Sequence, residues 1–379
     1  MLILIATLSI IGISLVVLIP GMDINSVSIS NSTTNTESIN PVYTLVGEEE
    51  NRNIVPPELI VNGGPPPDGI PSIDNPKFIQ IRKAEEFLED SDLVVGLNIN
   101  GDIRAYPLQI LVWHEIVNDK VGNTPVAVTY CPLCFTNQVF NRTMNDGQIL
   151  EFGTSGKLYN SNLVMYDRTT KSLWSQAMAQ GIGGTFAGIK LERIPFDVAY
   201  WKEWKQLYPD SKVLSTDTGS TRPYGADPYG DYYTNGEILF PVSNSDDRVG
   251  LKEIVIGLEN KGQYKAFKLQ EIEGKKVINN QVNGKPIVLL SLHPFMARVY
   301  DPVVNGQTLE FNYNIKDKKF VDKQTNSMWN FDGKSISGQM KGKQLTRLSF
   351  DEGFWFEWVA FHPKTELYDS SNNDVKSAG

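Results

Sequence analysis

The sequence predicts a β-rich α+β fold: two tandem copies of a mainly antiparallel β domain, each ending in a short Trp-containing helix, preceded by one N-terminal membrane-anchor helix. Three observations lead to this prediction. Apolar, β-branched runs alternate with Asn-Gly and Asp-Gly pairs, which is typical of strands joined by tight turns. One pattern recurs after about 160 residues, a period far too long for a solenoid. Residues 1–19 are uncharged and, apart from Thr7, Ser9 and Ser14, apolar.

Length and charge limit the classes of function. With 379 residues, 41% of them hydrophobic, the chain is long enough to bury the core of more than one domain. Its formal net charge of −9 argues against a nucleic-acid partner, because binding to phosphates requires a basic face.

Residues 1–22 are predicted to be a transmembrane anchor or a signal. As a helix the apolar stretch would be about 28 Å long, close to the thickness of the hydrocarbon layer. It lacks the basic start and the small-residue cleavage site of a signal peptide, which favours an uncleaved anchor. The prediction is therefore a single-pass protein of the cell membrane with its body outside the cytoplasm. Secretion after cleavage is the alternative.

The rest of the chain divides by composition. Residues 23–54 are a Ser/Thr/Asn-rich flexible linker, 55–92 a Pro/Gly-rich wrap with a short helix at 83–89, and 370–379 a disordered tail. Copy one spans 93–214, with a hairpin at 94–106, a short helix at 107–113 and strands at 126–130, 138–142 and 149–152. Apolar residues at helical spacing in 196–208 predict its closing helix. An aromatic, Gly-rich connector (215–252) leads to copy two (253–369).

The two copies share residues in matching order. The matches include Val95-Gly96-Leu97 with Ile256-Gly257-Leu258, Leu150-Glu151-Phe152 with Leu309-Glu310-Phe311, Asp167 and Trp174 with Asp322 and Trp329, and Trp201 and Trp204 with Trp355 and Trp358. Positions present in both copies are expected to serve the fold, whereas positions present in only one are freer to serve a function.

The differences between the copies fall on three segments. Copy two has Lys275-Lys276 in place of His114-Glu115, and Leu292-His293-Pro294-Phe295 in place of the region that contains Cys131 and Cys134. The segment from Gly153 to Asn162 is shortened. We therefore predict one Cys/His-centred site, built in copy one.

The residue types of this site favour metal binding or thiol redox chemistry. Cys131, Cys134 and His114 are three ligands of the kind that copper, or zinc with an open position, prefers. The Cys-x-x-Cys spacing also suits a redox pair. A strand is expected after Cys134, which argues against a thioredoxin-like arrangement, where a helix follows the first cysteine.

Two alternatives remain open, so the residues do not decide whether the protein is an enzyme. Cys131 could be the nucleophile of a hydrolase or transferase, with His114 as base, Glu115 beside it, and Ser155, Asn160 and Asn162 as hydrogen-bonding groups for a ligand. The protein could also be a non-catalytic binding or scaffold module in which Cys131 and Cys134 form a structural disulfide. The Gly-Thr-Ser-Gly run at 153–156 lacks the spacing of a phosphate loop and is expected to be a turn beside the site. Asp68 and Asp74 are expected to be turn residues.

A set of motifs resembles one known family. These are Gly64-Pro65-Pro66-x-Asp68-Gly69-Ile70-Pro71, Trp113-His114-Glu115, Tyr130-Cys131-Pro132-Leu133-Cys134, and Ser155-Gly156-x-x-x-Asn160-Ser161-Asn162-Leu163-x-Met165-Tyr166-Asp167-Arg168. Over about Val55 to Pro363 the chain resembles the domain-of-unknown-function family 3179 (DUF3179). The resemblance implies a prokaryotic protein, often with an exported N-terminus, and no established activity. Phe135 departs from the family pattern, which has a glycine after the second cysteine.

Overall fold

Short, mainly antiparallel strands make up most of residues 52–370, the part of the chain that the computed structural model describes. The prediction of a β-rich fold with few helices is confirmed. The predicted anchor, nearly all of the predicted linker and the predicted tail beyond residue 370 lie outside the described residues. Within the described part, no helix is long and apolar enough to span a membrane.

The first half of the described chain follows the Pro/Gly-rich wrap. The wrap contains the 3₁₀ helix Pro57–Leu59, β1 (Ile60–Asn62), β2 (Phe78–Gln80) and α1 (Ile81–Ala84). The first half then consists of β3 (Leu93–Ile99), β4 (Asp102–Pro107), α2 (Leu108–His114), β5 (Ile116–Val121), β6 (Thr124–Cys131), β7 (Thr136–Asn141), β8 (Phe152–Tyr159), β9 (Asn162–Asp167), β10 (Leu173–Ser175), β11 (Gln180–Gly183), β12 (Asp197–Tyr200), α3 (Trp201–Leu207) and β13 (Lys212–Leu214).

The second half has its elements in a closely similar order. They are β14 (Ile254–Asn260), β15 (Gln263–Lys268), α4 (Leu269–Lys275), β16 (Val277–Val282), β17 (Lys285–His293), β18 (Met296–Asp301), β19 (Val303–Val304), β20 (Gln307–Thr308), β21 (Phe311–Asn314), β22 (Lys319–Asp322), β23 (Met328–Trp329), β24 (Thr346–Leu348), β25 (Asp351–Phe354), α5 (Trp355–Phe361) and β26 (Glu366–Leu367). Each half begins with a hairpin, a short helix and three antiparallel strands. Each has a strand leading into a Trp-x-x-Trp helix near its end.

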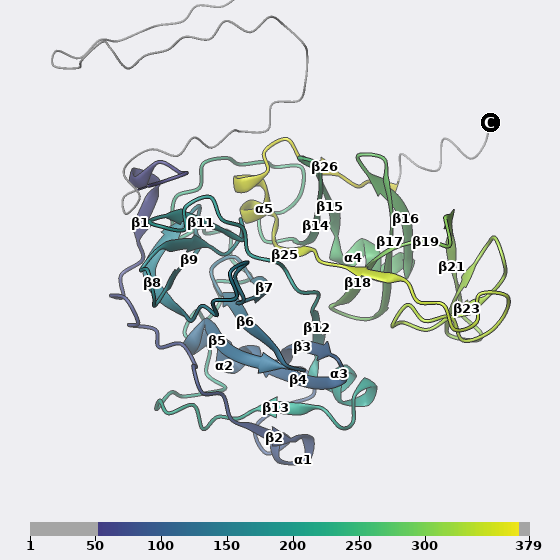
Figure 1. Cartoon of the computed structure of the whole chain (residues 1–379), viewed down its shortest axis with the longest axis horizontal. Helices are drawn as coiled ribbons and strands as arrows, with labels where there is room; N and C mark the ends of the chain where they lie inside the picture. Colours follow the sequence, from purple (N-terminus) through teal and green to yellow (C-terminus); the bar gives the residue numbers. More distant parts are fainter. Residues whose placement is uncertain (1–51, 371–379) are drawn as a thin grey trace, which may run out of the picture. The chain divides into compact units, whose positions relative to one another are not determined.

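Four larger sheets form the described part of the chain, and one of them contains strands of both halves (Figure 1). One has the order β12-β3-β4-β13-β2, and another, of seven strands, has the order β26-β15-β14-β25-β7-β6-β5, so β25 of the second half lies beside β7 of the first. The remaining larger sheets are β1-β8-β9-β10-β11 and β16-β17-β18-β24. Asp197 at the start of β12 binds Arg298 of β18, with both side chains buried and an N–O distance of 2.8 Å. At the matching place Asp351 of β25 binds Gln138 of β7.

Two expected helices are shorter than predicted. The helix expected at 83–89 is confined to Ile81–Ala84, and turns follow it. The helix expected within 196–208 begins only at Trp201, because Asp197–Tyr200 pair with Leu93–Gly96 as an edge strand. The buried Val198 and Ala199 therefore face the core from a strand, a role that their spacing in the sequence does not distinguish from a helix.

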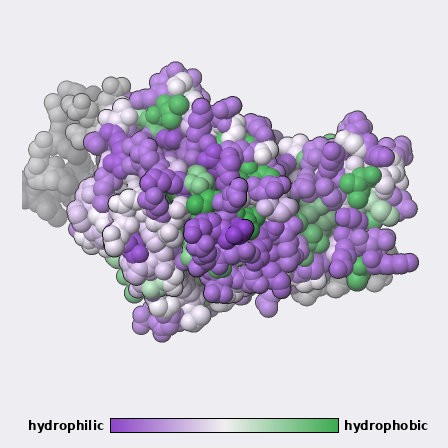
Figure 2. Space-filling model, turned by 90° about the horizontal axis from the view of Figure 1, so that it is seen from below, coloured by the Kyte–Doolittle hydropathy of each residue, from purple (hydrophilic) through white to green (hydrophobic). Residues whose placement is uncertain are grey.

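Exposed large apolar side chains are few and dispersed along the described chain, among them Leu59, Ile149, Leu239 and Ile315. The face shown in Figure 2 is mostly hydrophilic, with small separated apolar patches. This face therefore has no broad apolar surface of the kind that marks a stable protein interface.

Candidate functional site

Cys131 and Cys134 form the centre of the site. Cys131 is the last residue of β6, and the turn Pro132–Phe135 leads into β7, so the strand expected after the pair is confirmed. Both cysteines are free thiols with Sγ atoms 2.8 Å apart. They are 2% and 0% exposed. Burial, together with the neighbouring Cys131 thiol, raises the pKa of Cys134 well above its usual value.

The turn has a backbone conformation that favours glycine. Phe135 has a φ of 54°, in the left-handed region, which glycine adopts more readily than any other residue. Its ring stacks on Phe354 of β25, with centroids 5.6 Å apart, and lies edge-on to Tyr130. The aromatic contacts compensate for the strained backbone and pack the turn against the second half.

Asn162 connects the cysteines to their surroundings. Its Nδ2 lies 3.2 Å from the Sγ of Cys134, 3.2 Å from Oε1 of Glu357 and 3.3 Å from Oε1 of Gln176. Gln176 in turn donates to the hydroxyl of Thr129 and to the carbonyl of Thr136. All of these side chains are buried. The thiols therefore lie against a polar, hydrogen-bonded interior rather than an apolar one.

Three buried carboxyl groups lie in this region. Burial raises the pKa of Glu115, Glu352 and Glu357 to about 8 each. Glu357 is on α5, and Asp351 adds to the increase in its pKa while Arg193 opposes it. Both carboxyl oxygens of Glu352 are without a hydrogen-bond partner among the described residues. Buried carboxyl groups with raised pKa values are typical of functional sites, so these three are candidates for a role in the site.

The imidazole of His114 is bound elsewhere. Its Nδ1 lies 2.6 Å from the carbonyl oxygen of Pro71 and its Nε2 lies 2.7 Å from the hydroxyl of Tyr224. Since a carbonyl only accepts, Nδ1 carries the proton and Nε2 accepts from Tyr224. Burial lowers the pKa of His114, which favours this neutral form. Both ring nitrogens are thus occupied, and His114 joins the wrap to the connector.

The connector covers the site with tyrosines. We call Tyr224, Tyr229, Tyr232 and Tyr233 the tyrosine cap. The hydroxyl of Tyr232 donates to the carbonyl of Leu133 at 2.8 Å, between the two cysteines. The charge of the Cys131 thiolate would act on Tyr229, Tyr232 and Tyr233, raising the pKa of each, in addition to the larger effect of burial. Tyr232 and Tyr233 of the cap therefore contact the turn that carries the cysteines.

Two surface pockets lie away from the cysteines. One of 340 Å³ lies beside Asp102 and Lys212, and one of 110 Å³ lies beside Glu259 and Lys285. Neither is lined by a residue of the cysteine site or of the tyrosine cap. Because Cys131 is only 2% exposed, a reactant reaches it only when residues around it move.

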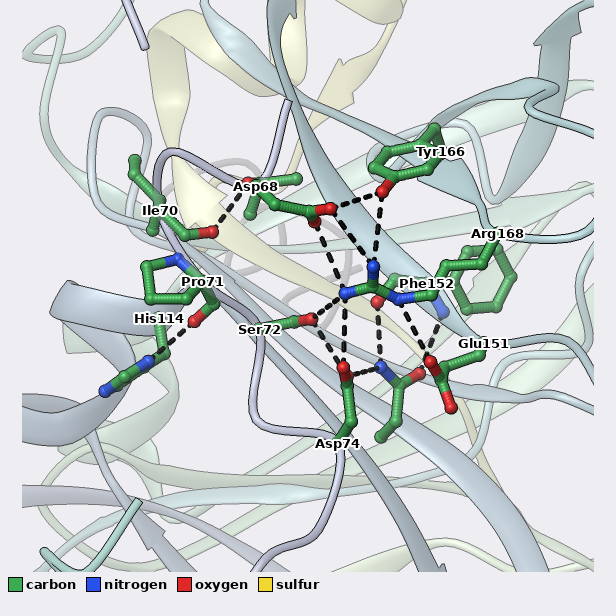
Figure 3. A network of polar contacts seen from close by, with 12 residues as sticks. Asp68, Ile70, Pro71, Ser72, Asp74, His114, Glu151, Phe152, Tyr166 and Arg168 are labelled. Atoms are coloured by element: carbon green, nitrogen blue, oxygen red, sulfur yellow. Dashed lines mark hydrogen bonds and ion pairs between the residues drawn. The ribbon is translucent and has the colours of Figure 1, made fainter. Parts of the chain in front are cut away.

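The wrap is attached by a network around Arg168 (Figure 3). The guanidinium of Arg168 binds the carboxylates of Asp68 at 3.0 Å, Asp74 at 3.1 Å and Glu151 at 3.0 Å. Asp68 does lie in a turn, with a φ of 56°, but its carboxylate also accepts from Tyr166. The Asp and Arg residues of the family motifs thus hold the wrap in place, and through it the carbonyl that binds His114.

The Gly-Thr-Ser-Gly run is part of β8 and contacts the wrap. A Cβ at Gly156 would lie 1.9 Å from the carbonyl oxygen of Pro65, and one at Gly153 would lie 2.5 Å from the carboxylate of Asp68. The hydroxyl of Thr154 donates to the carbonyl of Ile70. These glycines allow the wrap to approach the strand, so the run belongs to a bulged strand and not to the expected turn.

Of the polar residues predicted to bind a ligand, only Asn162 reaches the sulfurs. Ser155 donates to the carbonyl of Val164 within the β8–β9 pair. Asn160 lies 3.3 Å from the carbonyl of Ala360 and accepts from Ser243, which ties α5 and the connector to the first half. Both act on the packing of segments around the site.

The structure also bears on the predicted metal ligands. It brings Cys131 and Cys134 together, whereas His114 bonds to Pro71 and Tyr224. Over residues 52–370, no group of three or more His, Cys, Asp or Glu side chains is arranged to hold a metal ion. Glu357, which does approach Cys134 through Asn162, is absent from the sequence prediction, because more than 200 residues separate it from the cysteines and no motif links them.

Comparisons with known proteins give one match. A family model described as "Protein of unknown function (DUF3179)" matches residues 67–365. No curated protein and no solved structure matches the chain.

Proposed function

The chain belongs to the DUF3179 family, and we propose that it carries out a reversible dithiol–disulfide reaction at Cys131 and Cys134. One observation above all supports the proposal. Two free thiols, 2.8 Å apart, lie in a buried polar interior where the matching place in the second half is apolar. Since buried polar groups need partners to be tolerated, such an interior is expected to persist only where it serves a function.

The reaction needs a partner of the disulfide class. Cys131, the more exposed thiol, attacks a partner disulfide as a thiolate; a bond forms between its sulfur and one partner sulfur, and the other partner sulfur leaves with the electron pair. Cys134 then attacks the sulfur of Cys131, which forms the Cys131–Cys134 disulfide and releases the second partner thiol. Two thiols of the protein are oxidised and one partner disulfide is reduced.

Redox titration of the full-length chain tests the proposal. The protein is equilibrated in mixtures of reduced and oxidised glutathione, free thiols are alkylated, and the intact mass is measured. We expect both thiols to become protected together and reversibly, and Cys134→Ser to accumulate glutathione on Cys131. Thiols that stay alkylable in every mixture would refute the proposal. A bond that is reduced only after denaturation would indicate a structural disulfide instead.

Metal binding is the second candidate, because two adjacent sulfurs suit copper or zinc. Here His114 could serve only after leaving both Pro71 and Tyr224. Metal analysis of protein purified without chelator tests this candidate. Bound metal that is lost in Cys131→Ser and in His114→Ala would favour it over redox exchange. A cysteine nucleophile with His114 as base has the same difficulty, and an acylating probe that labels Cys131 without closing a disulfide would favour it.

We also propose that the body lies outside the cytoplasm and that its two halves arose by duplication. The uncharged apolar start of the sequence supports the first proposal, and protease added to intact cells tests it by cleaving the body only if it is external. The matching element order supports the second. Matched substitutions of Gly96 and Gly257, which each lie under a tryptophan, test the structural equivalence that this proposal requires.

A further inference from the structure

A carboxyl group of the second half lies beside Cys134 of the first, linked to it through Asn162. Glu357 lies on α5 and is 4% exposed. Figure 1 shows α5 beside the strands of the first half, and the bond from Asn160 to Ala360 attaches it there. One amide nitrogen, Nδ2 of Asn162, lies 3.2 Å from both the Sγ of Cys134 and Oε1 of Glu357. A thiol and a carboxyl group from different halves therefore share one donor.

The local sequence of the second half makes room for this contact. A Cβ at Gly353 would lie 2.7 Å from the Oγ1 of Thr136, 3.1 Å from the carbonyl oxygen of Cys134 and 3.4 Å from Oε2 of Glu357. The first half has Ala199 at the matching place on β12. Gly353 thus allows β25 of the second half to lie close to the backbone of Cys134.

The electrostatics of the pair couple the protonation of the two groups. Burial raises the pKa of Glu357 to about 8 and raises that of Cys134 as well, and the charges of Cys131 and Glu357 add to the effect on Cys134. The other charged groups that act on Glu357 are Asp351 and Arg193, and Thr136 is its further hydrogen-bonding neighbour. Ionising both groups would place two negative charges in a buried site. Moving one proton from Cys134 to Glu357 keeps a single charge there.

We infer that Glu357 accepts the proton of Cys134 when Cys134 attacks the mixed disulfide on Cys131, and that Asn162 is the positioning residue for this transfer. The inference rests on the proposed dithiol function. In this step the S–H bond of Cys134 breaks and its proton goes to the Glu357 carboxylate. A bond forms between the two cysteine sulfurs, and the bond from Cys131 to the partner breaks. The electron pair leaves with the partner sulfur as a thiolate.

The chain contains a matched control. Glu203 occupies the same place in α3, two residues after Trp201, as Glu357 does in α5, two residues after Trp355. It lies near the turn of the second half, where it acts on His293 instead of a cysteine. An acidic residue in the first turn stabilises either helix, so Glu203 controls for this effect, whereas only Glu357 is fully buried and accepts from Asn162 beside a cysteine.

The test measures how fast the mixed disulfide is resolved in the full-length chain. Oxidised glutathione is added, and acid-quenched samples are analysed by mass at pH values from 6 to 9. In the wild type the rate of resolution is expected to rise with a midpoint near pH 8, because Glu357 must be ionised to accept a proton. Glu357→Gln is expected to slow resolution about 100-fold near neutral pH and to abolish this midpoint. Glu203→Gln is expected to change neither.

Each outcome has one meaning. Normal formation of the mixed disulfide with unchanged resolution in Glu357→Gln overturns the inference alone, as do equal effects of Glu357→Gln and Glu203→Gln. If glutathione never attaches to Cys131, the proposed function fails and the inference fails with it. Should Glu357→Gln not fold, Glu357→Asp and Asn162→Ala carry the test: the first must keep the midpoint in pH, and the second must slow resolution.

Discussion

In each half the short helix is followed by a meander of three antiparallel strands, β5–β7 in the first half and β16–β18 in the second. The two halves share their structural contacts but differ in the interior behind the third of these strands. In both halves an asparagine of the first meander strand bonds to the backbone of a phenylalanine, Asn118 to Phe152 and Asn279 to Phe311. In both a buried aspartate accepts from a tryptophan, Asp167 from Trp174 and Asp322 from Trp329. Repeated contacts of this kind identify what the fold itself requires.

The interiors differ at three matched places. Thr129, Thr136 and Gln176 surround the cysteines, whereas their counterparts Leu290, Met296 and Phe331 belong to an apolar cluster with Trp329. The same fold therefore accepts an apolar filling here. The polar residues around the cysteines are therefore not required by the fold and belong to the site. Their hydrogen bonds to one another avoid the free-energy cost of burying unpaired polar groups.

Part of the asymmetry has a different cause. Trp113 donates to the carbonyl of Ala226, His114 accepts from Tyr224, and Leu133 accepts from Tyr232, so the residues of the first half bind the connector. In the described part of the chain only Tyr368, Asp369 and Ser370 follow the corresponding strand, β26, of the second half. A residue that only the first half retains can therefore serve either the chemistry of the site or the binding of the connector. His114 binds the connector.

The largest effect is expected where the halves are alike. Gly96 and Gly257 each lie under a tryptophan: a Cβ would be 2.0 Å from Cζ3 of Trp204 in the first case and 2.3 Å from Cζ3 of Trp358 in the second. Gly96→Ala and Gly257→Ala are each expected to lower the free energy of unfolding by about 3 kcal/mol through overpacking. Chemical denaturation measures the effect.

Gly274→Ala is the control, because a Cβ there meets no atom within 4 Å and the residue lies in α4. It is expected to be neutral or to stabilise by about 0.5 kcal/mol. A large defect in only one of the two tryptophan-covered positions would break the equivalence of the halves.

A second effect is expected where a buried acid replaces an apolar residue. Glu352 corresponds to Val198, and its oxygens have no partner among residues 52–370. Unfolded, the carboxyl ionises near its ordinary pKa of 4.5; folded, it stays protonated to about 8. Its contribution to stability is therefore lost as the pH rises between these values. Glu352→Val is expected to raise the free energy of unfolding at pH 8 by about 1–3 kcal/mol, and by less at pH 5.

Thermal unfolding at the two pH values measures this difference. Glu58→Gln, at an exposed position, serves as the control and is expected to change stability by less than about 0.5 kcal/mol at either pH. Lower stability of Glu352→Val at pH 8 would mean that the carboxyl group has a partner, such as buried water, that the apolar residue cannot replace.

Local sequence signals predict the strands and turns well. The Asn100-Gly101 pair does form the turn of a hairpin, with φ values of 53° and 83°. The helix expected at 107–113 is present at Leu108–His114. These features depend on neighbouring residues, so composition and periodicity are enough to find them.

The site could be predicted only in part. Cys131, Cys134 and Asn162 are found from motifs and from comparison of the halves. Glu357 and the tyrosine cap approach from segments far away in the sequence, and their roles follow from tertiary packing that no local pattern encodes. The loss of His114 from the second half predicts that it belongs to the site, whereas the wrap and the connector bind both nitrogens of its ring.

The smallest effect is expected at the cap. Tyr224→Phe removes the hydroxyl that binds Nε2 of His114 and contacts Thr218, but keeps the ring. Loss of one such hydrogen bond is worth about 1 kcal/mol, so opening of the cap should become roughly fivefold more frequent. Alkylation of Cys131 by a small maleimide is expected to accelerate by the same factor, and stability is expected to change little. Tyr313→Phe in the second half is the control.

The alkylation rate distinguishes gating by the connector from exposure through global unfolding. If the cap opens locally, the rate in Tyr224→Phe increases while the free energy of unfolding stays nearly constant. If the thiols become accessible only when the whole protein unfolds, alkylation follows stability alone, and Tyr224→Phe labels no faster than its stability predicts. The second result would mean that the connector is a fixed part of the core. It would also remove the route by which a partner disulfide reaches Cys131.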